Sequence, residues 1–388
     1  MRSNLSRTVW VLSLVSLFTD MASEMLYPVM PLYLKQIGFT IVVIGVLEGF
    51  AEAIAGLSKS YFGGLSDQWG KRLPFVQAGY ALSAVSKPMM ALFTSIGWIF
   101  TARTIDRLGK GLRTGARDAM LSAEATRETK GEVFGFHRSM DTLGAVIGPA
   151  LALAWLYFHP GEYKLLFLVA FLPGVVAVIF TFLVKEKKAS PQNRKNISLL
   201  EGFRYWKLTT REYRKVAGGL LMFALFNSSD VLLFLKMKEA GHTDSTIISV
   251  YIFYNLVYAL LAYPMGKLAD KIGVRNVFIT GLVFFAITYG GFAFSGSTWA
   301  FLVLFVCYGM YAACTEGVSK AWITNIIPHE EAATAIGTYT GFQSIAALIA
   351  SSVAGLIWYN FGPAAAFLSS AIVSILVIIW FRQQPAKP

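Results

Sequence analysis

A ten-residue phrase occurs twice in this chain, each time between two long apolar segments. Residues 63–72 read GGLSDQWGKR, and residues 266–275 read GKLADKIGVR. Both copies fit the pattern G-x-L-(S/A)-D-x-x-G-x-R, and every matched position is displaced by 203 residues, from 63 to 266. A polar turn that is duplicated between apolar segments predicts that the chain consists of two homologous halves.

Twelve apolar runs are long enough to cross a membrane, because a spanning helix needs about 20 predominantly apolar residues. They cover approximately residues 8–34, 41–62, 74–94, 97–120, 133–158, 165–184, 216–236, 246–265, 276–295, 298–321, 333–358 and 364–381. Only 14% of the residues are charged, whereas a soluble domain carries about 25%. We therefore predict an all-α integral membrane protein with twelve transmembrane helices in two pseudo-symmetric six-helix bundles.

The basic residues gather in alternate loops, and this accounts for the formal net charge of +12. If the N-terminus is cytoplasmic, most of the Lys and Arg residues outside the apolar runs fall on the cytoplasmic side, as the positive-inside rule requires. We expect both termini in the cytoplasm and no nucleic-acid partner. The short loops favour a bacterial inner (cytoplasmic) membrane.

Residues 185–215 divide the chain into an N-terminal six-helix bundle (1–184) and a C-terminal six-helix bundle (216–388). The first part of this cytoplasmic linker is charged. Its second part, 199–215, mixes aromatic and aliphatic residues with basic ones. That mixture predicts an amphipathic segment in the membrane interface, and a solvated loop is the alternative.

The repeat extends beyond the phrase. Residues 17–19 (LFT) recur as residues 225–227 (LFN), and Gly135 aligns with Gly337. Two parallel six-helix halves joined by a long linker form a known transporter plan. On these features the chain resembles the major facilitator superfamily over essentially its whole length, since the phrase matches that family's loop between helices 2 and 3. The resemblance implies rocker-switch transport, with helices 1, 4, 7 and 10 lining a central cavity.

The repeated phrase contains glycines for close approach and tight turns, and an aspartate and an arginine that can form a latch. The aspartate can accept hydrogen bonds from the N-terminus of a neighbouring helix. The resemblance implies a cytoplasmic gate that stabilises the outward-open state, and a topogenic turn is the alternative. The gate residues are Gly63, Asp67, Gly70 and Arg72 in the first copy, and Gly266, Asp270, Gly273 and Arg275 in the second.

The first run carries two carboxyl groups, Asp20 and Glu24, near its middle. Their i,i+4 spacing puts them on one face of a helix, and ionisable groups at membrane depth mark functional sites. We expect one of them to carry a coupling proton, with Pro28 and Pro31 breaking the helix nearby. The alternative is that both are permanently ion-paired for packing.

The fourth run has a charged stripe at helical spacing, and such a stripe cannot face lipid. It includes Arg103, Asp106, Arg107 and Lys110. The piece from Arg107 to Gly111 resembles the superfamily's R-x-x-Q-G pattern, with Lys110 where Gln is usual. The resemblance implies a role in proton transfer or substrate binding, and we expect these residues to contact an anionic or zwitterionic substrate.

The fifth run contains Gly144, Gly148 and Pro149 in the order G-x-x-x-G-P. This order is similar to a fifth-helix motif of proton-linked antiporters in the superfamily, although the glycines that usually follow are absent. The resemblance implies export. The alternative is a helix-packing face that has no bearing on the direction of transport.

The second half has fewer charged residues inside its runs. We expect an aromatic and hydrogen-bonding wall that contacts an organic substrate. Its predicted cavity residues are Asn227, Asp230, Tyr311 and Glu316. Packing of the same aromatic residues is the alternative.

No enzyme constellation competes with transport. The four histidines lack metal-ligand spacing, and no P-loop is present. We expect no enzyme activity, no cofactor and no metal, and a monomer in the lipid bilayer whose partners are a small-molecule substrate and protons.

The sequence favours a secondary active transporter that exports an amphiphilic or anionic organic compound in exchange for protons. The first alternative is proton-coupled import of an anionic nutrient or a metal chelate. The second, from another class, is a membrane sensor or scaffold that does not transport.

Overall fold

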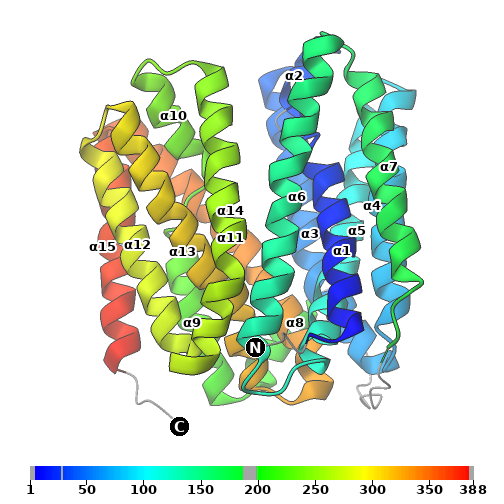
Figure 1. Cartoon of the computed structure of the whole chain (residues 1–388), viewed down its shortest axis with the longest axis vertical. Coiled ribbons are helices and arrows are strands. Elements are labelled where there is room, and N and C mark those ends of the chain that lie inside the picture. The colour runs from blue at the N-terminus through cyan, green and yellow to red at the C-terminus, as the bar shows by residue number, and fades with distance from the viewer. Residues whose placement is uncertain (1–4, 28, 187–197, 199, 384–388) are drawn as a thin grey trace. The chain divides into compact units, whose positions relative to one another are not determined.

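The computed structural model describes residues 5–27, 29–186, 198 and 200–383. Within these residues the chain is helical and has no strand (Figure 1). The helices up to the linker are α1 (Arg7–Glu24), α2 (Met30–Gln36), α3 (Ile41–Trp69), α4 (Leu73–Leu92), α5 (Ile96–Ala123), α6 (Lys130–Phe158), α7 (Tyr163–Thr181) and α8 (Glu201–Leu208). The later helices are α9 (Arg211–Ala224), α10 (Val231–Glu239), α11 (Asp244–Ile272), α12 (Val274–Phe294), α13 (Thr298–Asn325), α14 (Ala332–Phe361) and α15 (Pro363–Gln383).

The chain forms two compact units, and neither is continuous in sequence. Unit 1 consists of Met1–Thr126, Met140–Leu208 and Ile327–Gly341, and unit 2 consists of Arg127–Ser139, Thr209–Ile326 and Phe342–Pro388. Two of the boundaries, after Ser139 and after Gly341, fall inside the long helices α6 and α14. The repeat predicts bundles of residues 1–184 and 216–388. In the structure residues 127–139 belong instead to unit 2, and residues 327–341 belong to unit 1.

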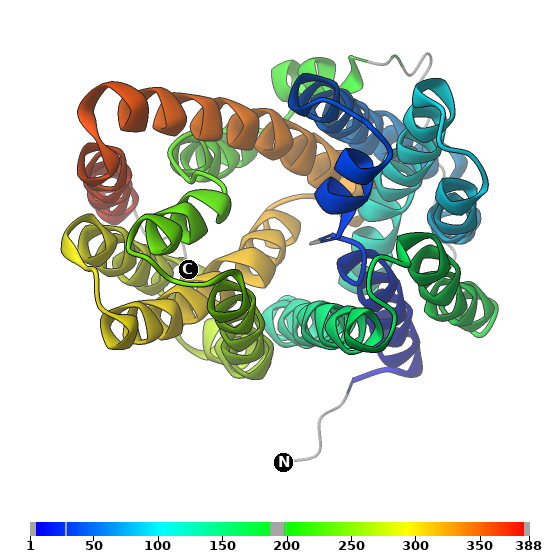
Figure 2. The same cartoon turned by 90° about the horizontal axis from the view of Figure 1, so that it is seen from above.

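The packing inside the two units follows one pattern. In unit 1, α4 packs on α5 and α7, α5 packs on α3, and α7 packs on α1. In unit 2, α12 packs on α13 and α15, α13 packs on α11, and α15 packs on α9. Figure 2 shows the same helices from above. The same order of neighbours in both units confirms the two homologous bundles that the repeated phrase predicts.

Glycines occupy equivalent contacts in the two units. A Cβ at Gly79 on α4 would lie 2.7 Å from the carbonyl oxygen of Gly109 on α5, and a Cβ at Gly281 on α12 would lie 2.7 Å from the Thr315 side chain on α13. Only glycine permits so close an approach without displacement of its neighbour. The repeat thus extends to individual helix contacts.

The first helix of each half is broken. Residues 25–29 separate α1 from α2, and residues 225–230 separate α9 from α10. Pro31 is the second residue of α2, whereas Pro28 lies outside the described residues. The first break is where the prolines predict it. The second break contains no proline, and it divides run 216–236, for which the sequence predicts one continuous span.

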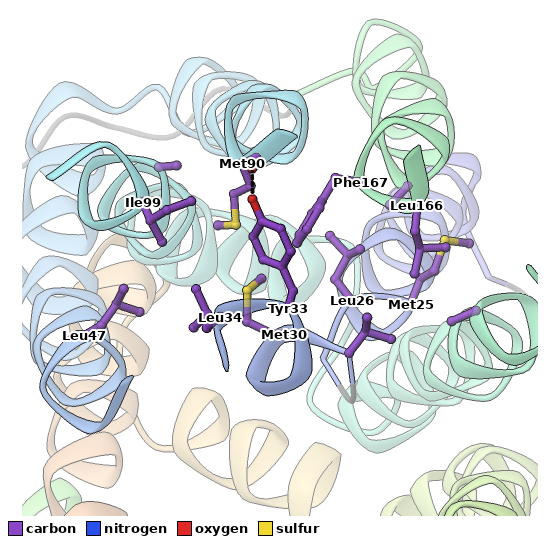
Figure 3. Close-up of a cluster of buried hydrophobic side chains, with 14 of the residues drawn as sticks. Met25, Leu26, Met30, Tyr33, Leu34, Leu47, Met90, Ile99, Leu166 and Phe167 are labelled. Carbon is purple, nitrogen blue, oxygen red and sulfur yellow. Dashed lines mark hydrogen bonds between the residues drawn. The ribbon is translucent and has the colours of Figure 1, made fainter. Parts of the chain in front are cut away.

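An apolar cluster holds the short helix α2 in unit 1 (Figure 3). Tyr33 lies at its centre, 1% exposed. Its hydroxyl donates to the carbonyl oxygen of Met90 at 2.9 Å, and its ring meets Phe167 edge-on at 4.9 Å between centroids. Burial of these side chains stabilises α2 although a seven-residue helix is too short to be stable alone.

Seven of the described helical segments are long and apolar enough to cross a membrane by length and composition. They are Lys130–Phe158, Tyr163–Thr181, Thr246–Ile272, Val274–Phe294, Thr298–Asn325, His329–Phe361 and Pro363–Gln383. The helix α5 is outside this set, and its charged stripe lowers its hydropathy. The short pieces α2, α9 and α10 are also outside it.

The linker carries one short helix, α8, which packs on α3. Phe203 and Leu208 are exposed on it, whereas Tyr205 is buried and donates to Glu331 at 3.0 Å. The amphipathic segment expected within 199–215 therefore has helical structure. Residues 187–197 and 199 of the linker lie outside the described residues.

Candidate functional site: two latches and two buried polar clusters

The first copy of the phrase ends α3 and binds the start of α14. Asp67 is 2% exposed. Its Oδ2 accepts from the backbone N–H of Thr334 at 2.7 Å and from the Thr334 hydroxyl at 2.8 Å, and its Oδ1 accepts from Arg72 at 3.0 Å. A carboxylate at a helix start satisfies an N–H group that has no partner within the helix. We call Asp67, Arg72 and Thr334 the first latch.

Two glycines of the same phrase make this geometry possible. A Cβ at Gly63 would collide with the carbonyl oxygen of Ala333, so glycine is needed where α14 crosses α3. Gly70 ends α3 in the left-handed conformation, with φ of 61°. Arg72 can then turn back toward Asp67, and it also donates to the carbonyl oxygen of His329 at 2.9 Å.

The second copy of the phrase ends α11 and binds the start of α6. The carboxylate of Asp270 accepts from the backbone N–H groups of Gly131 at 2.7 Å and Glu132 at 2.6 Å. A Cβ at Gly266 would collide with the carbonyl oxygen of Gly131. Gly273 has a positive φ of 93°. We call Asp270, Gly131 and Glu132 the second latch.

The arginines of the two phrases behave differently. Arg72 pairs with Asp67, whereas Arg275 donates to the carbonyl oxygen of Phe381 and makes no ion pair with Asp270 in the described part of the chain. In the second latch the additional side-chain contacts are made by the carboxylate of Glu132. Tyr263 donates to Glu132 at 2.8 Å, and Lys267 lies 3.3 Å from it.

The charged stripe of the fourth run lies on α5, and its carboxylate is held by α4. Asp106 lies 2.7 Å from the ammonium group of Lys87 and 3.9 Å from Arg103. Ser86 is a further hydrogen-bond partner of Asp106, at 3.3 Å. These charged side chains are buried, and burying paired charges costs much less free energy than burying an isolated charge.

The other predicted residues of this stripe are less enclosed. Arg107 is half-buried, and Lys110 is exposed. Two buried arginines, Arg113 and Arg117, follow them toward the C-terminal end of α5. Arg113 donates to Ser83 at 2.6 Å and lies over the ring of Tyr80, and Arg117 pairs with Asp118 at 2.9 Å.

Asp20 and Glu24 both lie on α1, one turn apart and half-buried. The glycines of α6 bring its backbone against this part of α1. A Cβ at Gly144 would lie 3.1 Å from the Cβ of Asp20, and a Cβ at Gly148 would lie 3.2 Å from the carbonyl carbon of Glu24. Pro149, within the same helix, is buried. The helix-packing motif and the two carboxyl groups therefore lie at one helix contact.

In unit 2 the polar cluster forms at the break between α9 and α10. Asp230, the last residue of the break, accepts from the hydroxyl of Tyr254 at 3.1 Å and from that of Tyr308. Asn227 donates to the hydroxyl of Tyr311 at 2.8 Å. The structure thus brings three of the predicted cavity residues into one tyrosine-lined cluster.

Aromatic rings surround this cluster. The ring centroid of Tyr308 lies 5.4 Å from that of Tyr311 and 5.2 Å from that of Tyr254. Glu316, the fourth predicted residue, lies half-buried further along α13. The cluster offers one carboxylate, one amide and three phenols within a wall of rings.

Sequence reasoning missed two parts of these clusters. The pairing of Lys87 with Asp106 is one of them, because it joins two helices and no local pattern in the sequence links the two residues. The break at 225–230 carries its own signal, since the run of Asn227, two serines and Asp230 is typical of a turn.

These features define a class of protein. Long apolar helices form two units with the same packing order, and both units enclose polar clusters that no soluble core would need. The family model of the Major Facilitator Superfamily matches residues 12–236 and 216–388. The chain therefore belongs to this superfamily of membrane transporters, which handle small-molecule substrates, and the resemblance inferred from the sequence is confirmed.

Curated relatives match over nearly the whole chain. An uncharacterized MFS-type transporter of Methanocaldococcus jannaschii is 31% identical over 378 residues, which cover 96% of this chain and 93% of the relative. A multi-drug resistance efflux pump PmrA homolog of Lactococcus lactis is 23% identical and covers 97% and 94%. The multidrug resistance protein MdtG of Escherichia fergusonii is also 23% identical, with the same coverage.

Solved structures show the same fold. The human organic anion transporter MFSD10 superposes with a TM-score of 0.85 at 17% identity, over 98% of this chain and 100% of that one. The transporter FucP in its outward conformation superposes with a TM-score of 0.78 at 13% identity, over the whole of both chains.

Proposed function

We propose that this transporter exports an amphiphilic or anionic organic compound in exchange for protons. One observation carries the proposal: the broken first helix of each half places carboxyl groups beside or within its break. Glu24 is the last residue of α1, Asp20 lies one turn before it, and Asp230 is the last residue of the break before α10. Ionisable groups at membrane depth are costly and mark substrate or proton pathways.

The coupling proton is assigned to Asp20 or Glu24. Two carboxyl groups one turn apart repel each other when both are ionised. Release of a proton from one of them then depends on what else occupies the site. This is the property that exchange of a substrate for a proton requires.

In unit 2 we assign substrate binding to the tyrosine-lined cluster, and in unit 1 to the less enclosed part of the α5 stripe. Phenol rings and one carboxylate around Asp230 suit an organic compound with both apolar and polar parts. Lys110 and Arg107 offer positive charge to an anionic group. Two relatives are described as multidrug resistance or efflux proteins, and this description supports export of such compounds.

Alternating access is assigned to the latches. Each one fixes a helix start through a carboxylate and a glycine contact, so opening on that side needs both contacts to break. We propose that the latched state is outward-open, with the latches and both termini on the cytoplasmic side. The protein would act as a monomer in a cytoplasmic membrane.

The test is transport by the purified protein in proteoliposomes with an imposed proton gradient. We expect substrate movement against its own gradient, and loss of that coupling in Asp20→Asn combined with Glu24→Gln. The control is Glu162→Gln, an exposed carboxyl group in the turn before α7. Full proton-driven transport by the double variant would contradict the assignment of the coupling proton.

A second function has its own support. The exposed Lys110, in a stripe rich in arginine, favours import of an anionic nutrient or chelate together with protons. The direction of movement in the same proteoliposomes separates import from export. A protein without any substrate-dependent flux across a broad panel of compounds would instead be a sensor or scaffold.

A further inference from the structure

A cavity of about 770 Å³ lies in unit 2, beside the second latch. It is large enough for a small organic ligand or a headgroup. Its wall is formed where several helices begin or end, at the start of α9, the turn between α11 and α12, and the ends of α13 and α15. Asp270 and Arg275 of the repeated phrase belong to the same wall.

Three cations in this wall have no fixed partner. Arg211 and Lys215 lie one turn apart on α9, and Arg127 precedes α6. All three are exposed, and within the described ranges none of their side chains has an ion-pair or hydrogen-bond partner. The wall also contains three carboxylates, Glu128, Glu212 and Asp270, and Asp270 already accepts two backbone N–H groups. The three exposed cations are therefore available to an anionic group that enters the cavity.

The opposite part of the wall is aromatic and polar. Trp322 on α13 and Trp380 on α15 are half-buried there. The Oδ1 atom of Asn325 is buried and accepts no hydrogen bond among the described residues. A buried acceptor without a donor is costly, so a ligand with a hydroxyl group would complete this site.

The level of the cavity matches a membrane surface. The candidate spans Thr298–Asn325 and Pro363–Gln383 end at it, and the span Val274–Phe294 begins at it. Tryptophans with basic residues at such a level are typical of the interfacial region. Basic pockets at the ends of transmembrane helices bind anionic lipid headgroups.

We propose that this cavity binds the glycerol phosphodiester headgroup of an anionic lipid. The phosphate lies between Arg211, Lys215 and Arg127, and a headgroup hydroxyl donates to Oδ1 of Asn325. The bound phosphate joins α9 to the segment just before α6. It therefore stabilises the start of α6 that Asp270 holds, and the lipid favours the latched state of unit 2.

The experiment is lipid binding by the full chain purified in detergent, followed by native mass spectrometry and by thermal unfolding. The probes are phosphatidylglycerol, phosphatidylcholine, phosphatidic acid and soluble glycerol 3-phosphate. We expect phosphatidylglycerol to bind and stabilise more than phosphatidylcholine. Each cation near the surface contributes about fivefold in affinity, so Arg211→Gln with Lys215→Gln lowers the affinity about thirtyfold.

The matched control is Arg214→Gln, because Arg214 is an exposed arginine of the same helix that does not line the cavity. It is expected to bind phosphatidylglycerol like the native protein. Asn325→Ala should weaken phosphatidylglycerol about fivefold, the effect of one hydrogen bond, and leave phosphatidic acid unchanged because that lipid has no glycerol headgroup.

Three results would overturn the proposal. They are equal stabilisation by phosphatidylcholine, an equal loss in Arg214→Gln, and binding of glycerol 3-phosphate with no response to the lipid, which would make the ligand soluble. None of these measurements depends on transport, so the proposal stands or falls separately from the proposed function.

Discussion

In both copies of the repeated phrase the aspartate holds the start of another helix, but the two aspartates make different sets of contacts. Asp67 is buried and holds both an arginine and a threonine of a helix start, through three hydrogen bonds. Asp270 is half-buried and accepts two backbone N–H groups, and none of the described side chains donates to it. The carboxylate at a helix start is common to both, whereas the ion pair belongs to the first alone.

This difference shows which part of the phrase is structural in both halves. The first glycine and the aspartate of the phrase make the equivalent contact in both halves, so these two positions are fixed by the geometry of a helix crossing. The arginine makes its ion pair with the aspartate in the first copy only. In unit 2 the described residues show no cation paired with Asp270, and Lys267 pairs instead with Glu132, to which Tyr263 also donates.

The largest expected effect is the loss of the first aspartate. Asp67→Ala leaves the guanidinium of Arg72 buried without its ion-pair partner, and we expect the free energy of unfolding to fall by about 3–5 kcal/mol. Asp270→Ala removes one acceptor of two N–H groups and should cost about 1–3 kcal/mol. Equilibrium unfolding of the purified protein in detergent measures both. Equal losses of unfolding free energy in the two variants would contradict the stronger role of the first aspartate.

Substitution of the arginine should also lower the free energy of unfolding more in the first copy than in the second. Arg72→Gln leaves the Asp67 carboxylate buried with only the bonds from Thr334, and should cost about 3 kcal/mol. Arg275→Gln removes a hydrogen bond to one carbonyl oxygen and should cost about 1 kcal/mol. The same unfolding assay ranks the two variants. A larger loss for Arg275→Gln would mean that its contact with Phe381 matters more than the buried ion pair.

The glycines, in contrast, should behave alike. Gly63→Ala and Gly266→Ala each insert a methyl group against a backbone carbonyl, and each should cost about 1–3 kcal/mol. The control is Gly97→Ala, where no atom lies within 4 Å of the new Cβ and the change should stay below about 1 kcal/mol. If only one of the two latch glycines responds, the crossings are not equivalent.

The smallest effect concerns the outer contacts of the second latch. Lys267 is partly exposed and pairs with Glu132 at 3.3 Å. Lys267→Gln should therefore change the free energy of unfolding by less than about 1 kcal/mol. High salt should have little further effect on the variant. A loss as large as that of Asp270→Ala would place the strength of this latch in the ion pair.

Much of the fold could be predicted from the sequence, because hydropathy and a repeated phrase are local patterns. The two bundles, the positive-φ glycines and the break near Pro31 all depend on residues close together in the chain. The break at 225–230 was missed because no proline marks it, although its serines and Asn227 favour a turn.

The partners in the site depend on distant residues and are harder to predict. The aspartate of the phrase predicts a helix start as its partner, but not that the partner is Thr334 in one case and Gly131 in the other. Lys87 and Asp106 carry no pattern that links them. Arg275 and Arg72 occupy the same position of the repeated phrase. Their partners differ, because Arg275 donates to the carbonyl oxygen of Phe381 and Arg72 pairs with Asp67.

The most direct test of the paired latches is hydrogen exchange at the amides they hold. The account predicts that Asp67→Asn speeds exchange at Thr334, that Asp270→Asn speeds exchange at Gly131 and Glu132, and that the native protein protects Thr334 more strongly than the other two. If exchange at these three amides is fast in the native protein, or does not respond to either substitution, the carboxylates do not hold the helix starts and the account is wrong.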